Sequence, residues 1–194
     1  LFMSRIDPIK GTANLAEAWG RLAPTHPDWQ LVIAGADSGG HQRTFEAALA
    51  RANVIDRTVF IGPVYAEAKK HLLSSCDVFV QPSYQENFGI TIAEAMASAR
   101  PVITTKGTPW HELVTRRCGW WIDIGVDPLA EAMGEAMSRS PSDLAAMGQR
   151  SRLFIEERYS WETVAVELAT AYAWLLGRHE KPPFGYEPGD TIPQ

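Results

Sequence analysis

Two glutamates, Glu86 and Glu94, lie eight positions apart in a segment that suits a ligand site. Glu86 comes in a turn just after the apolar run 78–80, and Glu94 lies within the helical pattern that follows Gly89. A strand, a glycine-containing turn and a helix start place both carboxylates near the carboxyl edge of a sheet, where open α/β folds bind ligands. Carboxylates there can accept pairs of hydroxyl hydrogen bonds, which suits a ribose or a hexose. Glutamates at this spacing also occur by chance in helices, so the spacing alone does not establish a site.

A basic loop follows the first expected strand. Arg5 and Lys10 flank a turn at Asp7-Pro8, and Gly11 stands where the next helix begins. An arginine fork, a lysine point charge and the free N–H groups of a helix start form an anion site that best matches a diphosphate. The alternative is a pair of solvated surface charges, which the loop alone does not exclude.

Other motifs are weaker. The glycine-rich segment 35–40 is not the dinucleotide pattern and does not follow the first strand, so we interpret it as a turn. Gly62 ends the third expected strand, where its backbone could contact a planar base or simply turn the chain. We interpret His111, beside Trp110, as structural, and the five histidines do not fall at metal-ligand spacing.

The elements that would position these residues alternate along the first two thirds of the chain. The predicted strands are Leu1–Ser4, Gln30–Ala34, Thr58–Ile61, Asp77–Gln81, Pro101–Thr104 and Gly119–Ile122. The predicted helices between them are Thr12–Leu22, Gln42–Ala52, Ala66–Ser74 and Ile90–Ala97, followed by Pro128–Arg139, Pro141–Glu157 and Ser160–Leu176. Continuous apolar strands indicate parallel pairing with both faces buried. The pattern predicts an α/β fold: a Rossmann-like, doubly wound parallel sheet of about six strands with helices on both faces and a helical C-terminal section.

Composition narrows the class of protein. The 194 residues are 45% hydrophobic and 21% charged, as in a soluble globular protein with a sizeable core. A net charge of -5 and a pI of about 5.5 argue against a nucleic-acid partner. Cys76 and Cys118 lack disulfide or metal spacing and indicate reduced thiols. We see neither a signal peptide nor an apolar run of the roughly 18 residues that a membrane span needs.

We expect residues 1–178 to form one domain and residues 179–194 a flexible tail, because the tail is rich in proline and glycine. The segment Leu1–Met3 already has a strand pattern, so we expect the chain to be a fragment of a longer protein. The last helix, from Ser160 to Leu176, is more aromatic than a lone surface helix needs. It would pack either on a missing partner domain or on its own sheet.

Six motifs in order give a resemblance to a known family. They are Ser4-Arg-x-Asp-Pro-x-Lys-Gly11, Leu31-Val-Ile-Ala-Gly35, Val59-Phe-Ile-Gly62, Cys76-Asp-Val-Phe-Val-Gln-Pro-Ser83, Glu86-Asn-Phe-Gly…Glu94-Ala-Met96 and Pro101-Val-Ile103. Together they resemble the family 4 (group 1) glycosyltransferases, and more narrowly the C-terminal, nucleotide-sugar-binding half of such a GT-B enzyme. The resemblance covers about residues 1–176 and implies one half of a GT-B fold.

The resemblance also implies roles for individual residues. Arg5 and Lys10 would hold the donor diphosphate and stabilise the charge on the leaving nucleotide, and Glu86 would face the transferred sugar. These are the implied catalytic residues. The implied donor-binding residues are Gly62, Asn87, Phe88, Gly89, Ile90 and Glu94, with Glu94 on the ribose hydroxyls. Members of this family resemble one another in retaining the anomeric configuration and in lacking the metal-binding Asp-x-Asp of the other large transferase fold, so we expect no obligatory metal or cofactor beyond a UDP- or GDP-sugar.

A family of this kind implies a cytoplasmic enzyme, in the cytosol or at the inner face of the plasma membrane with only peripheral contact. It would move sugar to a glycan or lipid-linked acceptor, as in bacterial surface polysaccharide synthesis. The acceptor would be held by an N-terminal domain absent from this chain, so we expect the fragment to be inactive alone. Two departures, Gly107–Leu113 and Ala99-Arg100, leave the donor contacts there open. A sugar-nucleotide epimerase and a non-enzymatic nucleotide-binding module are the competing interpretations.

Overall fold

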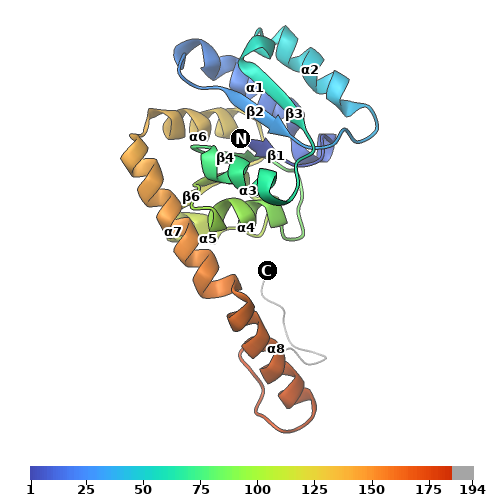
Figure 1. Ribbon diagram of the computed structural model, residues 1–194, viewed down its shortest axis with the longest axis vertical. Coiled ribbons are helices and arrows are strands. Elements are labelled where there is room, and N and C mark those ends of the chain that lie inside the picture. The colour runs from blue at the N-terminus through green and yellow to red at the C-terminus, as the bar shows by residue number, and fades with distance from the viewer. Residues whose placement is uncertain (185–194) are drawn as a thin grey trace. The chain divides into compact units, whose positions relative to one another are not determined.

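Six short parallel strands form the centre of the first of two compact units, residues 1–153, in a computed structural model that describes residues 1–184 (Figure 1). The strands are β1 (Phe2–Met3), β2 (Leu31–Ala34), β3 (Thr58–Gly62), β4 (Phe79–Gln81), β5 (Val102–Thr105) and β6 (Gly119–Ile122). Strands β1, β2 and β3 pair in parallel in that order, and so do β4, β5 and β6. All six lie within the predicted ranges or one residue beyond them.

The two sets of strands meet where β1 lies beside β4. The N–H of Val80 donates to the carbonyl of Leu1 at 2.8 Å, and the amino group of Leu1 donates to the carbonyl of Val78 at 2.8 Å. The spatial order is therefore β3-β2-β1-β4-β5-β6. The chain reverses its direction of winding between β1 and β4, and such a switch point is where doubly wound folds bind ligands at the carboxyl ends of the strands.

Helices connect the strands, as strictly parallel pairing requires. They are α1 (Thr12–Leu22), α2 (His41–Arg51), α3 (Ala66–Ser75), α4 (Ile90–Ala97), α5 (Glu112–Thr115), α6 (Val126–Ser138), α7 (Pro141–Tyr159) and α8 (Trp161–Leu175). Three 3-10 turns, η1 (Pro8–Lys10), η2 (Ala23–Thr25) and η3 (Ile55–Arg57), join them. Helix α1 contacts both α2 and α6, and α3 contacts α4. The predicted α/β fold with a parallel, doubly wound sheet is confirmed.

The hydrophobic core explains why these apolar runs fold as they do. Leu15 and Trp19 recur at helical spacing on α1 and are almost completely buried. They belong to one cluster with Ile33 of β2 and with Leu129 and Met133 of α6. Burying each large side chain contributes about 1.5–3 kcal/mol, so this cluster fixes the sheet that carries the loops at its carboxyl edge.

The second compact unit begins at Phe154, within α7. Its helix α8 starts at a cap in which the Ser160 hydroxyl accepts the N–H of Thr163 at 3.1 Å. No residue of α8 is buried, and Trp161 is 85% exposed. The predicted flexible tail, 179–194, lies largely outside the described residues, and the division into a 1–178 domain and a tail stays a prediction.

Candidate functional site

A cavity of about 540 Å³ opens at the carboxyl ends of β1 and β4, at the switch point of the sheet. It is lined by Ser4, Arg5, Ile9, Lys10, Gln81, Gln85, Glu86, Asn87, Phe88, Gly89, Ile90 and Thr91. The structure therefore brings together the predicted basic loop, the first glutamate and the loop that leads into α4. Of the predicted site residues, Gly62 and Glu94 do not line this cavity.

The basic loop is held by its own turn. Asp7 caps η1 by accepting the N–H of Ile9 at 3.0 Å, and this hydrogen bond, assisted by the Ser38 hydroxyl, holds the pKa of Asp7 below its usual value. Gly11 follows in the left-handed region with φ of 74°, and a Cβ there would lie 2.0 Å from the carbonyl oxygen of Pro82. The loop after β1 thus presses against the loop after β4, which directs Lys10 toward Glu86.

Glu86 is the most heavily bonded group in the cavity. Its Oε1 accepts the ammonium of Lys10 at 2.6 Å, the amide Nε2 of Gln81 at 2.6 Å and the hydroxyl of Ser83 at 2.9 Å. The Lys10 and Glu86 side chains are only 13% and 12% exposed, so the pair is well shielded. The sequence predicted Lys10 and Glu86 as site residues but not that they would bond each other.

Arg5 also lines this cavity. Its side chain is exposed. Within residues 1–184 it makes none of the observed hydrogen bonds or ion pairs. The guanidinium is therefore available to an anion bound in the cavity that Lys10 also lines.

The loop 86–89 is anchored from behind by the segment after β5. The N–H of Glu86 donates to the carbonyl of Gly107 at 2.8 Å, and the indole N–H of the buried Trp110 donates to the carbonyl of Phe88 at 2.6 Å. Gly89 then starts α4 as its N-cap. The first N–H groups of a helix have no intrahelical acceptor, so the start of α4 offers donors to an anion or a sugar at the cavity wall.

Glu94 lies one turn further into α4. Its Oε1 pairs with Lys69 of α3, and its Oε2 is buried without a hydrogen-bond partner among the described residues. A buried carboxylate oxygen without a donor is costly, and a ligand hydroxyl would satisfy it. Gly62 ends β3, where its carbonyl already accepts the N–H of Gly35 at 2.9 Å.

Four residues of this region were not predicted as site residues from the sequence: Gln81, Ser83, Thr91 and Lys69. Gln81 had a visible signal, because it is a polar residue at the end of an otherwise apolar strand. The others are ordinary polar residues in sequence, and only the packing of the loops and helices reveals their partners.

Other candidate nucleophiles and ligands lie elsewhere. Cys76 and Cys118 are free cysteines that form no disulfide, and burial raises the pKa of each thiol. His111 is 65% exposed and contacts Glu112 and Trp121 rather than the cavity. Among residues 1–184 no cluster of three or more His, Cys, Asp or Glu side chains could hold a metal ion.

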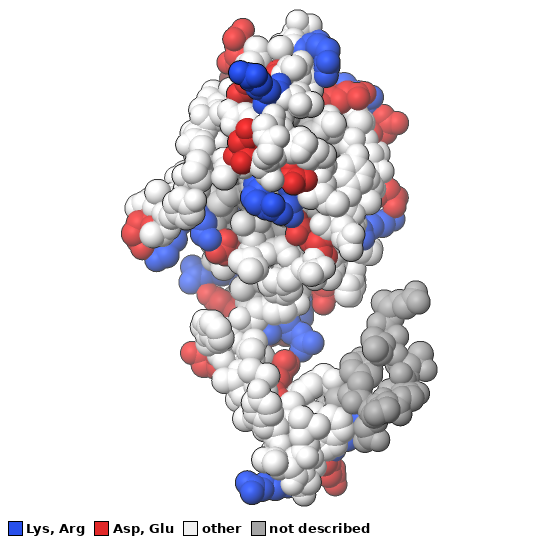
Figure 2. Space-filling model, turned by 90° about the vertical axis from the view of Figure 1, so that its right-hand side faces the viewer, with Lys and Arg blue, Asp and Glu red and all other residues white. Residues whose placement is uncertain are grey.

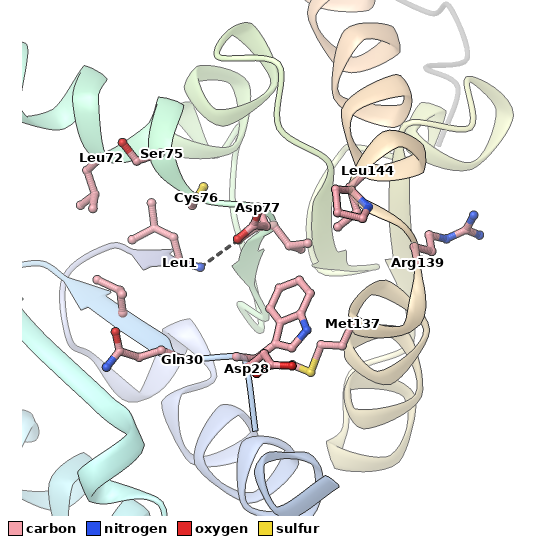
Figure 3. Close-up of a pocket in the computed structure, with 14 residues that line it drawn as sticks. Leu1, Asp28, Gln30, Leu72, Ser75, Cys76, Asp77, Met137, Arg139 and Leu144 are labelled. Atoms are coloured by element: carbon pink, nitrogen blue, oxygen red, sulfur yellow. Dashed lines mark hydrogen bonds between the residues drawn. The ribbon is translucent and has the colours of Figure 1, made fainter. Parts of the chain in front are cut away.

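A second cavity, of about 560 Å³, lies at the opposite edge of the sheet (Figure 3). Leu1, Gln30 and Asp77, which line it, come from the amino-terminal ends of strands, and Met137 comes from the end of α6. None of the predicted site residues lines it. The chemistry that the motifs supply is thus concentrated at the carboxyl edge.

Basic side chains do not gather into one patch on the face of the molecule that Figure 2 shows. Figure 2 shows acidic and basic side chains interspersed over that face, in keeping with the net charge of -5. No helix within residues 1–184 has both the length and the hydropathy needed to cross a bilayer.

Comparison with known proteins settles the family. The family described as glycosyl transferases group 1 matches residues 1–154. The chain belongs to this family. The resemblance seen in the six motifs is confirmed, and the Rossmann-like sheet is that of one half of a GT-B glycosyltransferase.

Individual relatives give the same picture. A lipopolysaccharide core biosynthesis mannosyltransferase, LpsB of Rhizobium meliloti (strain 1021), is 36% identical over 187 residues, covering 89% of this chain and 50% of LpsB. The solved sucrose-phosphate synthase from Thermosynechococcus elongatus is 26% identical, with a TM-score of 0.79 over 91% of this chain and 45% of that one. HepE of Anabaena, solved in complex with UDP-glucose, has a TM-score of 0.77 at 22% identity, over 89% of this chain and 48% of HepE.

The chain spans about half the length of the curated relatives it matches.

Proposed function

We propose that this chain is the donor-binding domain of a retaining glycosyltransferase that transfers a sugar from a nucleotide-sugar to a glycan or lipid-linked acceptor. The observation that carries the proposal is the convergence of Arg5, Lys10 and Glu86 on one cavity at the switch point, beside the start of α4. The relationship to LpsB, a lipopolysaccharide core mannosyltransferase, supports a role in bacterial surface polysaccharide synthesis.

The proposed chemistry assigns each group a task. Arg5 and Lys10 bind the diphosphate and stabilise the negative charge that grows on it as the bond to the sugar breaks. Glu86 and the backbone of Asn87 to Ile90 hold the transferred sugar. Glu94 accepts hydrogen bonds from the ribose hydroxyls, and its buried Oε2, which lacks a hydrogen-bond partner in the described part of the chain, supports this role. Gly62, at the end of β3, is the proposed contact for the base.

The two cations supply the electrostatic stabilisation, so the proposal requires no metal ion. An acceptor domain in a longer protein would close over the cavity, exclude water and orient the second reactant. The chain alone would bind the donor and transfer nothing. The donor is a UDP- or GDP-sugar, since HepE is solved with UDP-glucose and a related mannosyltransferase of Corynebacterium glutamicum is GDP-mannose-dependent.

Thermal unfolding with UDP, GDP, ADP and NAD tests the donor site. At a hundredfold excess over Kd a ligand adds about 2.7 kcal/mol, or roughly 5–10 °C in Tm at this size. We expect one nucleoside diphosphate to give this shift with or without EDTA, and Arg5→Ala to abolish it.

The matched control is Arg51→Ala at the end of α2, an exposed arginine outside the cavity. It should leave the shift intact. Equal loss in both variants, or a shift with NAD alone, would contradict the proposal.

A further inference from the structure

A buried glutamine on β4 connects the two halves of the candidate site. Gln81 is 1% exposed, although it is polar and follows two buried apolar residues, Phe79 and Val80. Burying an amide is unfavourable unless its donor and its acceptor are both bonded. The structure satisfies both.

The two bonds of Gln81 fix its orientation. Its Nε2 donates to Glu86 Oε1 at 2.6 Å, and its Oε1 accepts the hydroxyl of Thr91 at 2.6 Å. Glu86 lies in the loop after β4, and Thr91 lies in the first turn of α4. The amide thus ties the carboxylate to the helix start that opens the cavity.

All three protein donors to the Glu86 carboxylate converge on Oε1. They are Lys10, Gln81 and Ser83, and among the described residues none donates to Oε2. This arrangement holds the carboxylate in one orientation and leaves the second oxygen for a ligand hydroxyl. Of the three, only Gln81 is itself held by a further bond to α4.

We propose that Gln81 is a positioning residue that orients the Glu86 carboxylate toward the sugar of the bound nucleotide-sugar. This inference rests on the proposed function, because it assigns the sugar to Glu86. Gln81 itself would touch neither the diphosphate nor the base. Removing the Gln81 amide should therefore lower the affinity for a sugar nucleotide and leave the affinity for the nucleotide alone unchanged.

Calorimetric titration separates these two effects. UDP-glucose and GDP-mannose are compared with UDP and GDP on the wild-type chain and on Gln81→Leu. We expect Gln81→Leu to lower affinity for the sugar nucleotide about tenfold, with a change of less than about twofold for the matching nucleoside diphosphate. Thr91→Val, which removes only the second bond, should give a smaller loss, about threefold, in the same direction.

A second substitution at position 81 distinguishes a positioning role of Gln81 from simple misfolding of the variant. Gln81→Glu keeps the shape and the bond from Thr91 but places a carboxylate against Glu86. The charged groups that line this cavity are Arg5, Lys10 and Glu86. Two carboxylates in contact share a proton, which raises the pKa of one of them. Sugar-nucleotide binding by Gln81→Glu should therefore be poor at about pH 8 and approach that of the wild type at about pH 5, a recovery that a purely structural defect would not show.

The control is another glutamine–glutamate pair. Gln42 donates to Glu46 at 2.7 Å on α2, away from the cavity, and Gln42→Leu should leave all affinities unchanged. An equal loss of nucleotide and sugar-nucleotide binding in Gln81→Leu, or no loss, would overturn the role of Gln81. Failure of the wild-type chain to bind any of the four compounds would overturn the proposed function itself, and this role with it.

Discussion

At the scale of single residues, the charged side chains of the site differ in whether they are paired with one another. Lys10 and Glu86 neutralise each other across 2.6 Å, whereas Arg5 lies exposed on the same cavity. An incoming diphosphate would meet Arg5 first, and the Lys10 ammonium has further N–H donors to share between Glu86 and the ligand. Lys10 can therefore serve both partners.

The proposed contact between Glu94 and the ribose can be tested with nucleotides that lack a ribose hydroxyl. If the Oε2 of Glu94, which has no hydrogen-bond partner within residues 1–184, accepts a ribose hydroxyl, the wild-type chain should bind the ribonucleotide about tenfold more tightly than the 2′-deoxyribonucleotide. Glu94→Ala should bind both forms equally. Titration with UDP and 2′-deoxy-UDP, or with the guanine pair, measures this preference.

Glu112 provides the matched control, because its Oε2 is also buried without a hydrogen bond among residues 1–184, although His111 Nδ1 lies 3.4 Å from it, and because Glu112 lies on α5 rather than on α4. Glu112→Ala should keep the preference for the ribonucleotide. Discrimination that survives in Glu94→Ala would remove Glu94 from the ribose site.

At the scale of elements, the loop after β5 supports the loop after β4. Gly107 approaches so closely that a Cβ would lie 2.2 Å from the carbonyl oxygen of Tyr84. The carbonyl of Gly107 accepts a hydrogen bond from the N–H of Glu86, and the indole N–H of Trp110 donates one to the carbonyl of Phe88. Two loops that follow neighbouring strands thus form one rigid wall of the cavity.

Trp110→Phe tests this support. The substitution keeps most of the ring but leaves the Phe88 carbonyl without its 2.6 Å donor. We expect the free energy of unfolding to fall by about 1–3 kcal/mol. Amide exchange at Asn87 to Gly89 should accelerate, as measured by chemical denaturation and hydrogen exchange.

Trp161→Phe on α8 is the control for that variant, since Trp161 is 85% exposed. Its stability should match that of the wild type. Unchanged exchange at the 87–89 loop in Trp110→Phe would show that the indole bond does not support the loop.

The elements also show what the sequence could predict. Strands such as Val102–Thr105 were recognisable because parallel strands buried on both faces need continuous apolar runs. Helix α5, Glu112–Thr115, was missed because four residues are too few to show a helical period. The Lys10–Glu86, Gln81–Thr91 and Lys69–Glu94 contacts were also missed, since partners that are 10 to 76 positions apart meet only through the topology.

At the scale of the whole molecule, the sheet order explains why one edge carries the chemistry. The reversal between β1 and β4 leaves room between the loops after these strands, and the basic and acidic motifs occupy those two loops. The sequence allowed this edge to be predicted because the motifs follow strands. It did not reveal the second cavity of Figure 3, which is formed by strand beginnings and the ends of helices.

The molecule as a whole can be tested for sugar transfer. We expect the chain to bind its donor but to transfer no labelled sugar from UDP-glucose or GDP-mannose to lipopolysaccharide core acceptors. Holding two reactants close together in the correct orientation supplies much of a transferase's rate, and the described cavity provides groups for the donor alone. Transfer above the rate of an Arg5→Ala control would show that the chain is catalytically complete.

The assignment of the donor site depends on where the nucleotide binds. A crystal structure of this chain with the nucleotide that gives the largest thermal shift would show it. We predict that the diphosphate contacts Arg5 and Lys10, with the ribose at Glu94. Nucleotide bound instead in the cavity lined by Leu1, Asp77 and Met137 at the opposite edge would contradict the account.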